Sequence, residues 1–326
     1  DHRRVTCTAF AAPPNSLRTR FALGRWFDFE GIDLFHSPFN ILPADLPVPA
    51  VFTLHDIMWL INHRYCTQIW WKKLIDGTFF KTLIPKSVDD AERVLTVSEY
   101  SRDAIESWFP EKEGRVHVAY NAVDDVFQPM SAEEGWPLIS KYLPRSRFVL
   151  VVGQGAPYKN HAGALEGFIE AFEDDPETYF VLIRRSIASG ASRLRELMDH
   201  PTVGPRIVSL QYVDFEELRA FYSLARTFLF PSLYEGFGLP QLEAMACGTP
   251  VVTSITGAPA EVGGDAAVTV DPESPAEIGA ALSRLAYDEE FYARRRRRGL
   301  ERAAEFTWER CARNTLDVYR RTVGAD

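Results

Sequence analysis

The chain has 326 residues, of which 46% are hydrophobic, so it is long enough to build two domains with separate cores. Its formal net charge of −9 argues against a general nucleic-acid-binding protein, because such proteins are usually basic. The basic run Arg294–Arg298 has glutamates beside it and is expected to be mostly a solvated helix face. The 4 cysteines lie far apart without a CxxC pair, which argues against a metal site and fits a reducing, cytoplasmic environment.

Short apolar runs alternate with longer amphipathic runs along the chain. Strands are expected at residues 3–10, 32–38, 49–56, 93–98, 115–120, 147–153, 179–185, 206–213, 227–232, 249–254 and 267–270. Helices are expected at residues 98–109, 160–175, 214–225, 239–248, 274–288, 289–306 and 307–321. Several strand candidates are apolar on both faces, as buried parallel strands are, so the pattern predicts a doubly wound α/β architecture.

Residues 127–147 interrupt this alternation with prolines and a cluster of charges. We therefore expect an N-terminal α/β domain at residues 1–140 and a second, similar domain at residues 146–305, with a cleft between them. The last stretch, residues 306–326, has apolar residues at helical spacing and is expected to pack back onto the first domain.

The segment 234–252, YEGFGLPQLEAMACGTPVV, carries the most specific pattern in the chain. It follows a strand and predicts a loop, then a helix with Pro240 in its first turn and Gly248 at its end. Gly236 and Gly238 permit close backbone approach and unusual φ angles. Because ligands bind at the carboxyl ends of strands in open α/β sheets, the free N–H groups of Gly238 and Leu239 predict an anion site.

Two glutamates, Glu235 and Glu243, flank this predicted anion site. A carboxylate beside a phosphate repels it, unless the carboxylate points at neutral donors. Each carboxylate can accept two hydrogen bonds from a vicinal diol, such as a ribose or a sugar. The pattern therefore indicates sugar, diphosphate and ribose in a line, as in a nucleotide sugar. The alternative is that both are carboxylates favoured by the helix dipole.

The segment 230–254 resembles the retaining glycosyltransferases of family 4, which have the GT-B fold and an E-x7-E motif. Further segments match that family in order, at residues 33–43, 51–60, 93–105, 115–129, 149–160, 210–225, 264–278 and 306–320. The resemblance implies two Rossmann-like doubly wound domains facing a central cleft. It is strongest to bacterial mannosyltransferase-like and rhamnosyltransferase-like enzymes of surface-polysaccharide pathways.

The resemblance also assigns roles around the E-x7-E motif. Glu235 is expected to hold hydroxyls of the transferred sugar, and Glu243 to hold the ribose diol. The loop that begins at Gly236 would place the backbone amides of Phe237, Gly238 and Leu239 on the distal phosphate.

A second anion-binding element is implied after the strand at residues 147–153. Lys159 matches the family's lysine as a point charge on the diphosphate, and Gly153 and Gly155 let the loop approach the ligand. Gln154 and Tyr158 stand where the family often has an arginine. Arg184 or Arg185 could supply a second cation, and a solvent-facing role for them is equally open.

The resemblance places the nucleobase near the backbone of Tyr212 and Val213. A simpler interpretation of this stretch, a capping box of Asp214 and Glu217, is compatible with that contact. His55 is expected to touch the transferred sugar, although a structural role is an alternative. Asp56 is expected either to orient His55 or to cap the following turn.

These roles predict a retaining hexosyltransferase that uses a GDP- or UDP-sugar, with GDP-mannose favoured, and a saccharide or lipid-linked acceptor. No metal and no cofactor is expected. The alternatives are a nucleotide-sugar epimerase of similar fold and a non-catalytic nucleotide-sugar-binding protein. The aromatics and lysines at residues 70–86 favour a core role over peripheral contact with the inner membrane. Because residues 1–60 hold no Gly-rich loop, an N-terminal piece is expected to be absent or disordered.

Overall fold

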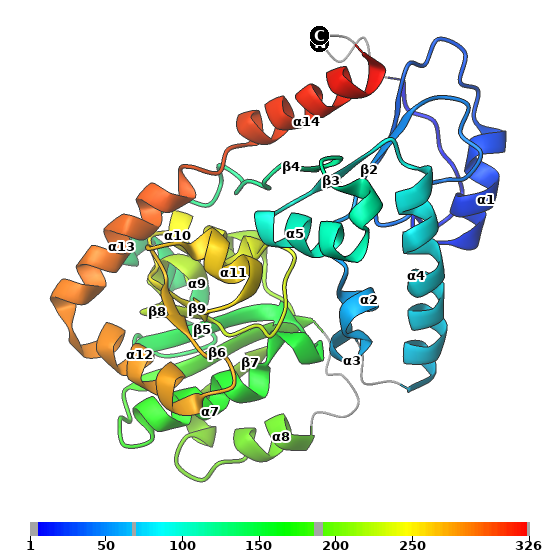
Figure 1. The fold of residues 1–326 in the computed structure, drawn as a ribbon. Helices are drawn as coiled ribbons and strands as arrows, with labels where there is room; N and C mark the ends of the chain where they lie inside the picture. The colour runs from blue at the N-terminus through cyan, green and yellow to red at the C-terminus, as the bar shows by residue number, and fades with distance from the viewer. Residues whose placement is uncertain (1–5, 67–69, 186–191, 325–326) are drawn as a thin grey trace.

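The computed structural model describes residues 6–66, 70–185 and 192–324, and its strands form two parallel sheets (Figure 1). In the described part, the first sheet has the order β1-β2-β3-β4, from β1 (Phe35–Ser37), β2 (Ala50–Thr53), β3 (Arg93–Thr96) and β4 (Val116–Val118). The second has the order β10-β9-β8-β5-β6-β7, from β5 (Arg147–Gln154), β6 (Thr178–Arg185), β7 (Ile207–Leu210), β8 (Thr227–Phe230), β9 (Val251–Ser254) and β10 (Val268–Val270). We call each sheet with the helices on it the first and second domain.

Helices connect the strands of both sheets. The first domain holds α1 (Leu17–Trp26), α2 (Met58–Ile61), α3 (His63–Cys66), α4 (Trp70–Asp90) and α5 (Glu99–Trp108). The second holds α6 (Ala132–Ile139), α7 (His161–Phe172), α8 (Ser192–Met198), α9 (Phe215–Leu224), α10 (Leu239–Ala246), α11 (Gly257–Gly263), α12 (Pro275–Tyr287) and α13 (Glu289–Ala303), and α14 (Trp308–Val323) ends the chain. None of these helices, as far as the structure describes them, combines the length and apolarity that crossing a bilayer requires.

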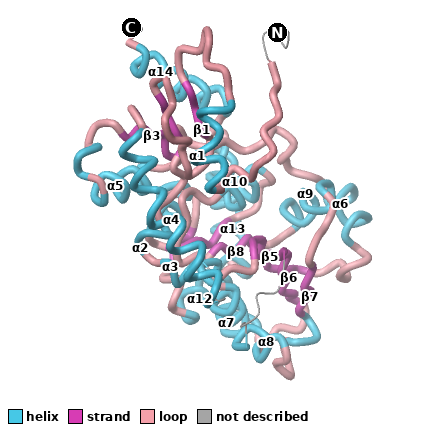
Figure 2. Tube along the Cα trace, turned by 90° about the vertical axis from the view of Figure 1, so that its right-hand side faces the viewer, coloured by secondary structure: helices cyan, strands magenta, loops and turns pink. Residues whose placement is uncertain are grey.

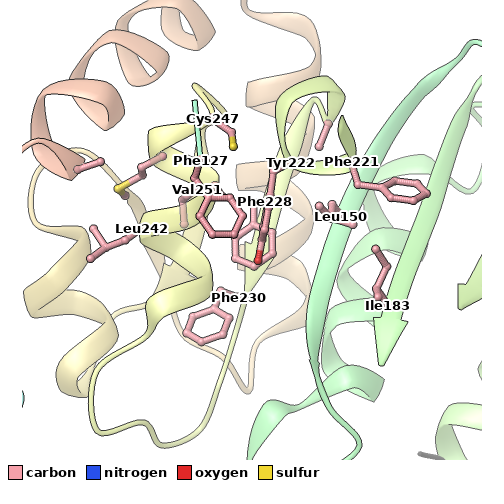
Figure 3. Packing of buried hydrophobic residues seen from close by; sticks show 14 of the residues in the cluster. Phe127, Leu150, Ile183, Phe221, Tyr222, Phe228, Phe230, Leu242, Cys247 and Val251 are labelled. Atoms are coloured by element: carbon pink, nitrogen blue, oxygen red, sulfur yellow. The ribbon is translucent and has the colours of Figure 1, made fainter. Parts of the chain in front are cut away.

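Alternating side chains of the second sheet enter two separate cores. In β5, Phe148 and Leu150 face one layer and Val149 and Val151 face the other, because successive side chains of a strand point to opposite faces. The first layer also contains Tyr222 of α9, which packs edge-on against Phe228 of β8 (Figure 3). In Figure 2, β8, β5, β6 and β7 follow one another across this doubly covered sheet.

The last helix, α14, does not stay with the second domain (Figure 1). It packs on β2 and β3 of the first sheet, where Val318 joins a buried cluster with Val51, Leu95 and Ala119. The Tyr319 hydroxyl is 2.5 Å from Nδ1 of His36 in β1. The opposite face of β2 and β3 enters a different core, through residues such as Phe52 and Val94. The C-terminal helix therefore covers a face of the first sheet that would otherwise lie open.

Three sequence predictions need correction. Residues 6–10 of the first expected strand form no strand, and residues 3–5 lie outside the described part of the chain. The expected interruption at residues 127–147 contains α6, which begins at a capping box of Ser131 and Glu134 and tolerates Pro137 in its interior. The arginines of α13 are only partly solvated, since Arg296 donates to the Gly248 carbonyl at 2.7 Å. The other expected strands are confirmed.

Candidate active site

The candidate residues gather where β5 and β8 end, and these two strands are neighbours in the second sheet. The loop after β5 forms a 3-10 turn, Pro157–Lys159, before α7. The N–H of Leu233, in the loop after β8, donates to the carbonyl of Tyr158 at 2.7 Å. This backbone bond joins the two loops and brings Lys159 next to Glu235.

Lys159 and Glu235 form a buried ion pair. The Lys159 ammonium donates to Oε1 of Glu235 at 2.6 Å, and the two side chains are 10% and 12% exposed. Burial raises the pKa of the Glu235 carboxyl, and the Lys159 charge opposes that rise. The two residues assigned to the diphosphate and to the transferred sugar are therefore in direct contact.

The loop after Glu235 ends in a helix start without a side-chain cap. Gly238 is the N-cap of α10 with φ 113°, a conformation that favours glycine, and Pro240 lies in the first turn. No described hydrogen bond uses the N–H of Phe237, Gly238 or Leu239. The predicted helix start is confirmed, and phosphate binding by these amides stays a prediction.

Gly236 is needed for a contact between the two domains. A Cβ atom at this position would lie 2.4 Å from the backbone oxygen of His55, in the loop after β2. Its φ is not positive, so the unusual backbone angle expected of both glycines belongs to Gly238 alone. The loop that carries Glu235 thus touches the loop that carries His55.

Glu243 lies on α10 and has a separate partner. Its Oε2 accepts a hydrogen bond of 2.7 Å from the hydroxyl of Tyr222, which is fully buried. Burial raises the pKa of Glu243, and the Tyr222 hydroxyl opposes the rise. No described hydrogen bond occupies its Oε1, so that oxygen is available to a ligand hydroxyl.

A set of basic side chains converges on Gly153, near the end of β5. Gly153 is paired with Arg184 of β6, and a Cβ on Gly153 would lie 3.3 Å from Cδ of Lys159 and 3.5 Å from Nε2 of His161. Gly155 lies in the bend that follows β5. The glycine at position 153 therefore leaves room for Lys159 and His161 to fold over the strand end.

Arg184 and His161 are buried, and each has a side-chain nitrogen without a hydrogen-bond partner. They are 4% and 7% exposed, and Nε of Arg184 and Nε2 of His161 have no partner in the described structure. Burial, with the charges of Arg184 and Lys159, lowers the pKa of His161 to about 3, so its imidazole is neutral. The solvent-facing alternative for Arg184 is wrong, and the side chain of Arg185 lies outside the described residues. His161 was not predicted, because its only signal is its position two residues after Lys159.

The remaining candidates lie further around the site. Tyr212 is 77% exposed and Val213 is buried, just beyond β7. The expected capping box is confirmed, since the N–H of Asp214 donates to Glu217 at 3.0 Å. Contact of this backbone with a nucleobase stays a prediction.

His55 is fixed by the first domain. Its N–H donates to the Asn40 side chain at 3.1 Å, and its Nε2 is 3.1 Å from the carbonyl of Pro38. Asp56 caps the following turn by accepting from the N–H of Met58 at 2.9 Å. Of the two roles expected for Asp56, the cap is the one observed. Among the described residues, no group of three or more His, Cys, Asp and Glu side chains is arranged to hold a metal ion.

The fold defines a class of protein. The structure resembles sucrose-phosphate synthase from Thermosynechococcus elongatus with a TM-score of 0.74 and 22% identity, over 91% of this chain and 75% of that one. The two facing parallel-sheet domains have the GT-B fold of glycosyltransferases, as predicted.

Two family models and named relatives narrow this class. Residues 1–127 match the model described as Glycosyltransferase Family 4, and residues 140–302 match Glycosyl transferases group 1. O-antigen chain mannosyltransferase B of Escherichia coli is 32% identical over 93% of this chain and 77% of that protein. Serotype-specific mannosyltransferase WbdA of Escherichia coli is 27% identical over 86% of this chain and 35% of that protein. The chain belongs to glycosyltransferase family 4 and is a hexosyltransferase, and nothing found favours the epimerase or the non-catalytic alternative.

Proposed function

We propose that this enzyme is a retaining mannosyltransferase, which moves the sugar of GDP-mannose to a hydroxyl of a saccharide or a lipid-linked glycan. The names of the O-antigen mannosyltransferases to which the chain is similar support mannose as the sugar and a surface polysaccharide as the product. The choice of GDP over UDP stays a prediction. We place the reaction in the cytoplasm, with peripheral contact at the membrane when the acceptor is lipid-linked.

The observation that carries this proposal is Arg184, a residue that is 4% exposed, whose Nε has no hydrogen-bond partner and whose side chain has no carboxylate partner among the described ion pairs. An uncompensated buried charge costs several kcal/mol, so an anion that occupies the space beside it removes a large penalty. Lys159 and the free amides at the start of α10 lie in the same group of loops. A diphosphate supplies enough negative charge to satisfy all three groups at once.

The carboxylates fit the two ends of such a donor. Glu235, held by Lys159, would accept hydroxyls of the transferred sugar close to the diphosphate. Glu243, held by Tyr222 through one oxygen, would accept the ribose diol through the other. His161, whose neutral ring lies beside Lys159 near Gly153, adds no negative charge next to the phosphates.

The reaction then needs one substitution at the anomeric carbon. The bond from this carbon to the β-phosphate oxygen breaks, and a bond to the acceptor oxygen forms on the same face of the sugar. The acceptor proton passes to the departing phosphate oxygen, and the bond electrons leave with the nucleoside diphosphate. Arg184, Lys159 and the α10 amides stabilise the charge that develops on the leaving group, so we propose that no metal ion takes part.

The test begins with a thermal-shift screen of the wild type against GDP-, UDP- and dTDP-sugars, followed by transfer assays with the sugar that binds. Arg184→Ala is expected to weaken binding of the nucleoside diphosphate at least tenfold. Arg193→Ala, which removes an exposed arginine of α8 that pairs with Glu166, is the matched control and should bind normally. Normal binding by Arg184→Ala, or transfer at the wild-type rate by Glu235→Ala, would reject the site. Full inhibition by EDTA would reject the metal-free step.

A further inference from the structure

Helix α5 of the first domain lies next to α11 of the second domain (Figure 1). The start of α5 contacts two groups of the second domain, a backbone carbonyl and a carboxylate. Its N-cap is Ser98, whose Oγ accepts from the N–H of Ser101 at 3.0 Å. The side chains of Ser98 and Ser101 are fully buried or nearly so, at 0% and 1% exposure. These serines therefore face protein groups rather than water.

The first group is the backbone carbonyl of Gly236, next to Glu235. Ser98 donates its hydroxyl hydrogen to this oxygen at 2.8 Å, and the Ser101 hydroxyl lies 3.2 Å from it. The Ser101 hydroxyl also lies 3.4 Å from the carbonyl of His55. One buried hydroxyl thus sits between the backbones of two candidate active-site loops, one from each domain.

The second group is the carboxylate of Glu261, which α11 carries. Its Oε1 accepts from the N–H of Glu99 and from the hydroxyl of Tyr120, both at 2.8 Å. Its Oε2 accepts from the N–H of Tyr100, also at 2.8 Å. The carboxylate therefore caps the start of a helix in the other domain, where the helix dipole favours negative charge.

These bonds run between the two domains rather than within either one. Ser98 already caps α5 from within the first domain, and water can satisfy the exposed amides of a helix start. The described side-chain hydrogen bonds of Glu261 all come from Glu99, Tyr100 and Tyr120, outside the second domain. Their energy is therefore gained only when the two domains touch.

We infer that Ser98, Ser101 and Glu261 are positioning residues, which fix the Glu235 loop against the His55 loop where the two domains meet. Glu235 follows the position of Gly236, because the two residues share a peptide bond, and Gly236 is fixed by a helix of the opposite domain. Productive placement of Glu235 is thereby linked to domain contact. The inference rests on the proposed role of Glu235 in holding the transferred sugar.

The main test compares Glu261→Ala with Glu134→Ala. Glu134 accepts from the N–H of Ser131, the N-cap residue of α6, so Glu134→Ala removes a carboxylate cap and leaves the domain contact unchanged. Glu261→Ala is expected to lower kcat at least tenfold and to change the donor Kd less than twofold, because the donor-binding residues lie in the second domain. Glu134→Ala is expected to leave both constants within twofold of the wild type.

Milder variants keep the test decisive if Glu261→Ala folds poorly. Tyr120→Phe removes one bond to Glu261, and Tyr142→Phe removes a comparable bond to Glu217 within the second domain. Only the first should lower kcat, by about threefold. Ser98→Thr keeps both the cap and the hydroxyl donor and should be active, whereas Ser98→Asp keeps the cap, loses the donor and should be slow.

Wild-type kcat in Glu261→Ala or Tyr120→Phe, corrected for the folded fraction, would overturn the inference. So would equal losses in each variant and its control. The proposed function fails separately: it is wrong if Glu235→Ala transfers normally. An inactive Glu235→Ala beside a fully active Glu261→Ala would reject only the positioning role.

Discussion

Replacement of Lys159 by methionine tests the buried ion pair at the centre of the site. The Lys159 ammonium and the Glu235 carboxylate are 2.6 Å apart and nearly inaccessible to water. Methionine keeps much of the length and apolar volume of the lysine stem and removes the charge. The substitution therefore leaves Glu235 buried without its counter-charge.

The contact distance sets the size of the effect. At an effective dielectric constant of about 20, two unit charges 2.6 Å apart attract by about 6 kcal/mol before desolvation is subtracted. Removing one partner of a buried pair typically costs about 3–5 kcal/mol. We expect Lys159→Met to lose about 3 kcal/mol of unfolding free energy at pH 8, and to lose transfer activity by about 10²–10³-fold, as other leaving-group stabilisers do.

The loss of stability should depend on pH. Burial raises the folded pKa of Glu235 above its unfolded value, so between these two pKa values the folded chain binds more protons than the unfolded chain. Stability from this group is therefore present at low pH and lost as the pH rises through the folded pKa. Without Lys159 the folded pKa rises further, so the destabilisation by Lys159→Met should be largest at pH 8 and smallest near pH 5.

Urea denaturation of the wild type, both single variants and the double variant Lys159→Met with Glu235→Gln measures the coupling. The double variant should recover at least about 2 kcal/mol relative to Lys159→Met, because no buried charge is left unpaired, while transfer stays abolished. A coupling below about 0.5 kcal/mol at pH 8, or a destabilisation that grows towards acid pH, would refute this account of the pair.

Three other predictions address separate parts of the molecule. Glu243→Ala should raise the donor KM about tenfold with a smaller change in kcat, because it removes charge-assisted bonds worth about 1.5–3 kcal/mol in all; an unchanged KM would count against ribose binding. Gly236→Ala places a Cβ 2.4 Å from the His55 oxygen and should lower kcat more than donor affinity, as stopped-flow and calorimetry can separate. Val318→Ala should destabilise the chain by about 2 kcal/mol, measured by urea denaturation, with little change in donor affinity.

The sequence predicted an element best where the local residue pattern alone determines where that element lies in the fold. The strands of the second sheet are continuous apolar runs because both faces are covered, so their positions follow from composition alone. The start of α10 at Gly238 and Pro240 is likewise set by local chemistry. In contrast, Pro137 suggested that the alternation of strands and helices is interrupted. A capping box that begins six residues upstream instead starts a helix, and this helix includes the proline.

The side-chain partnerships within the site could not be predicted in the same way. His161 reaches Gly153 because the turn after β5 folds Lys159 and His161 back over the strand. The spacing of these residues in the sequence does not predict that turn. The bond from Ser98 to Gly236 joins residues 138 positions apart. Such contacts depend on how the two domains meet, and one sequence holds no periodic signal for that arrangement.

The place of α14 has a consequence for the biogenesis of the enzyme. Val318 completes the cluster of Val51, Leu95 and Ala119, yet roughly 200 residues are synthesised between Ala119 and Val318. At about 5–20 residues per second, the ribosome needs about 10–40 s to make that stretch. Throughout this interval the face of the nascent first sheet on which α14 packs lacks that helix, so we expect Val51 and Leu95 to stay exposed until α14 has been made.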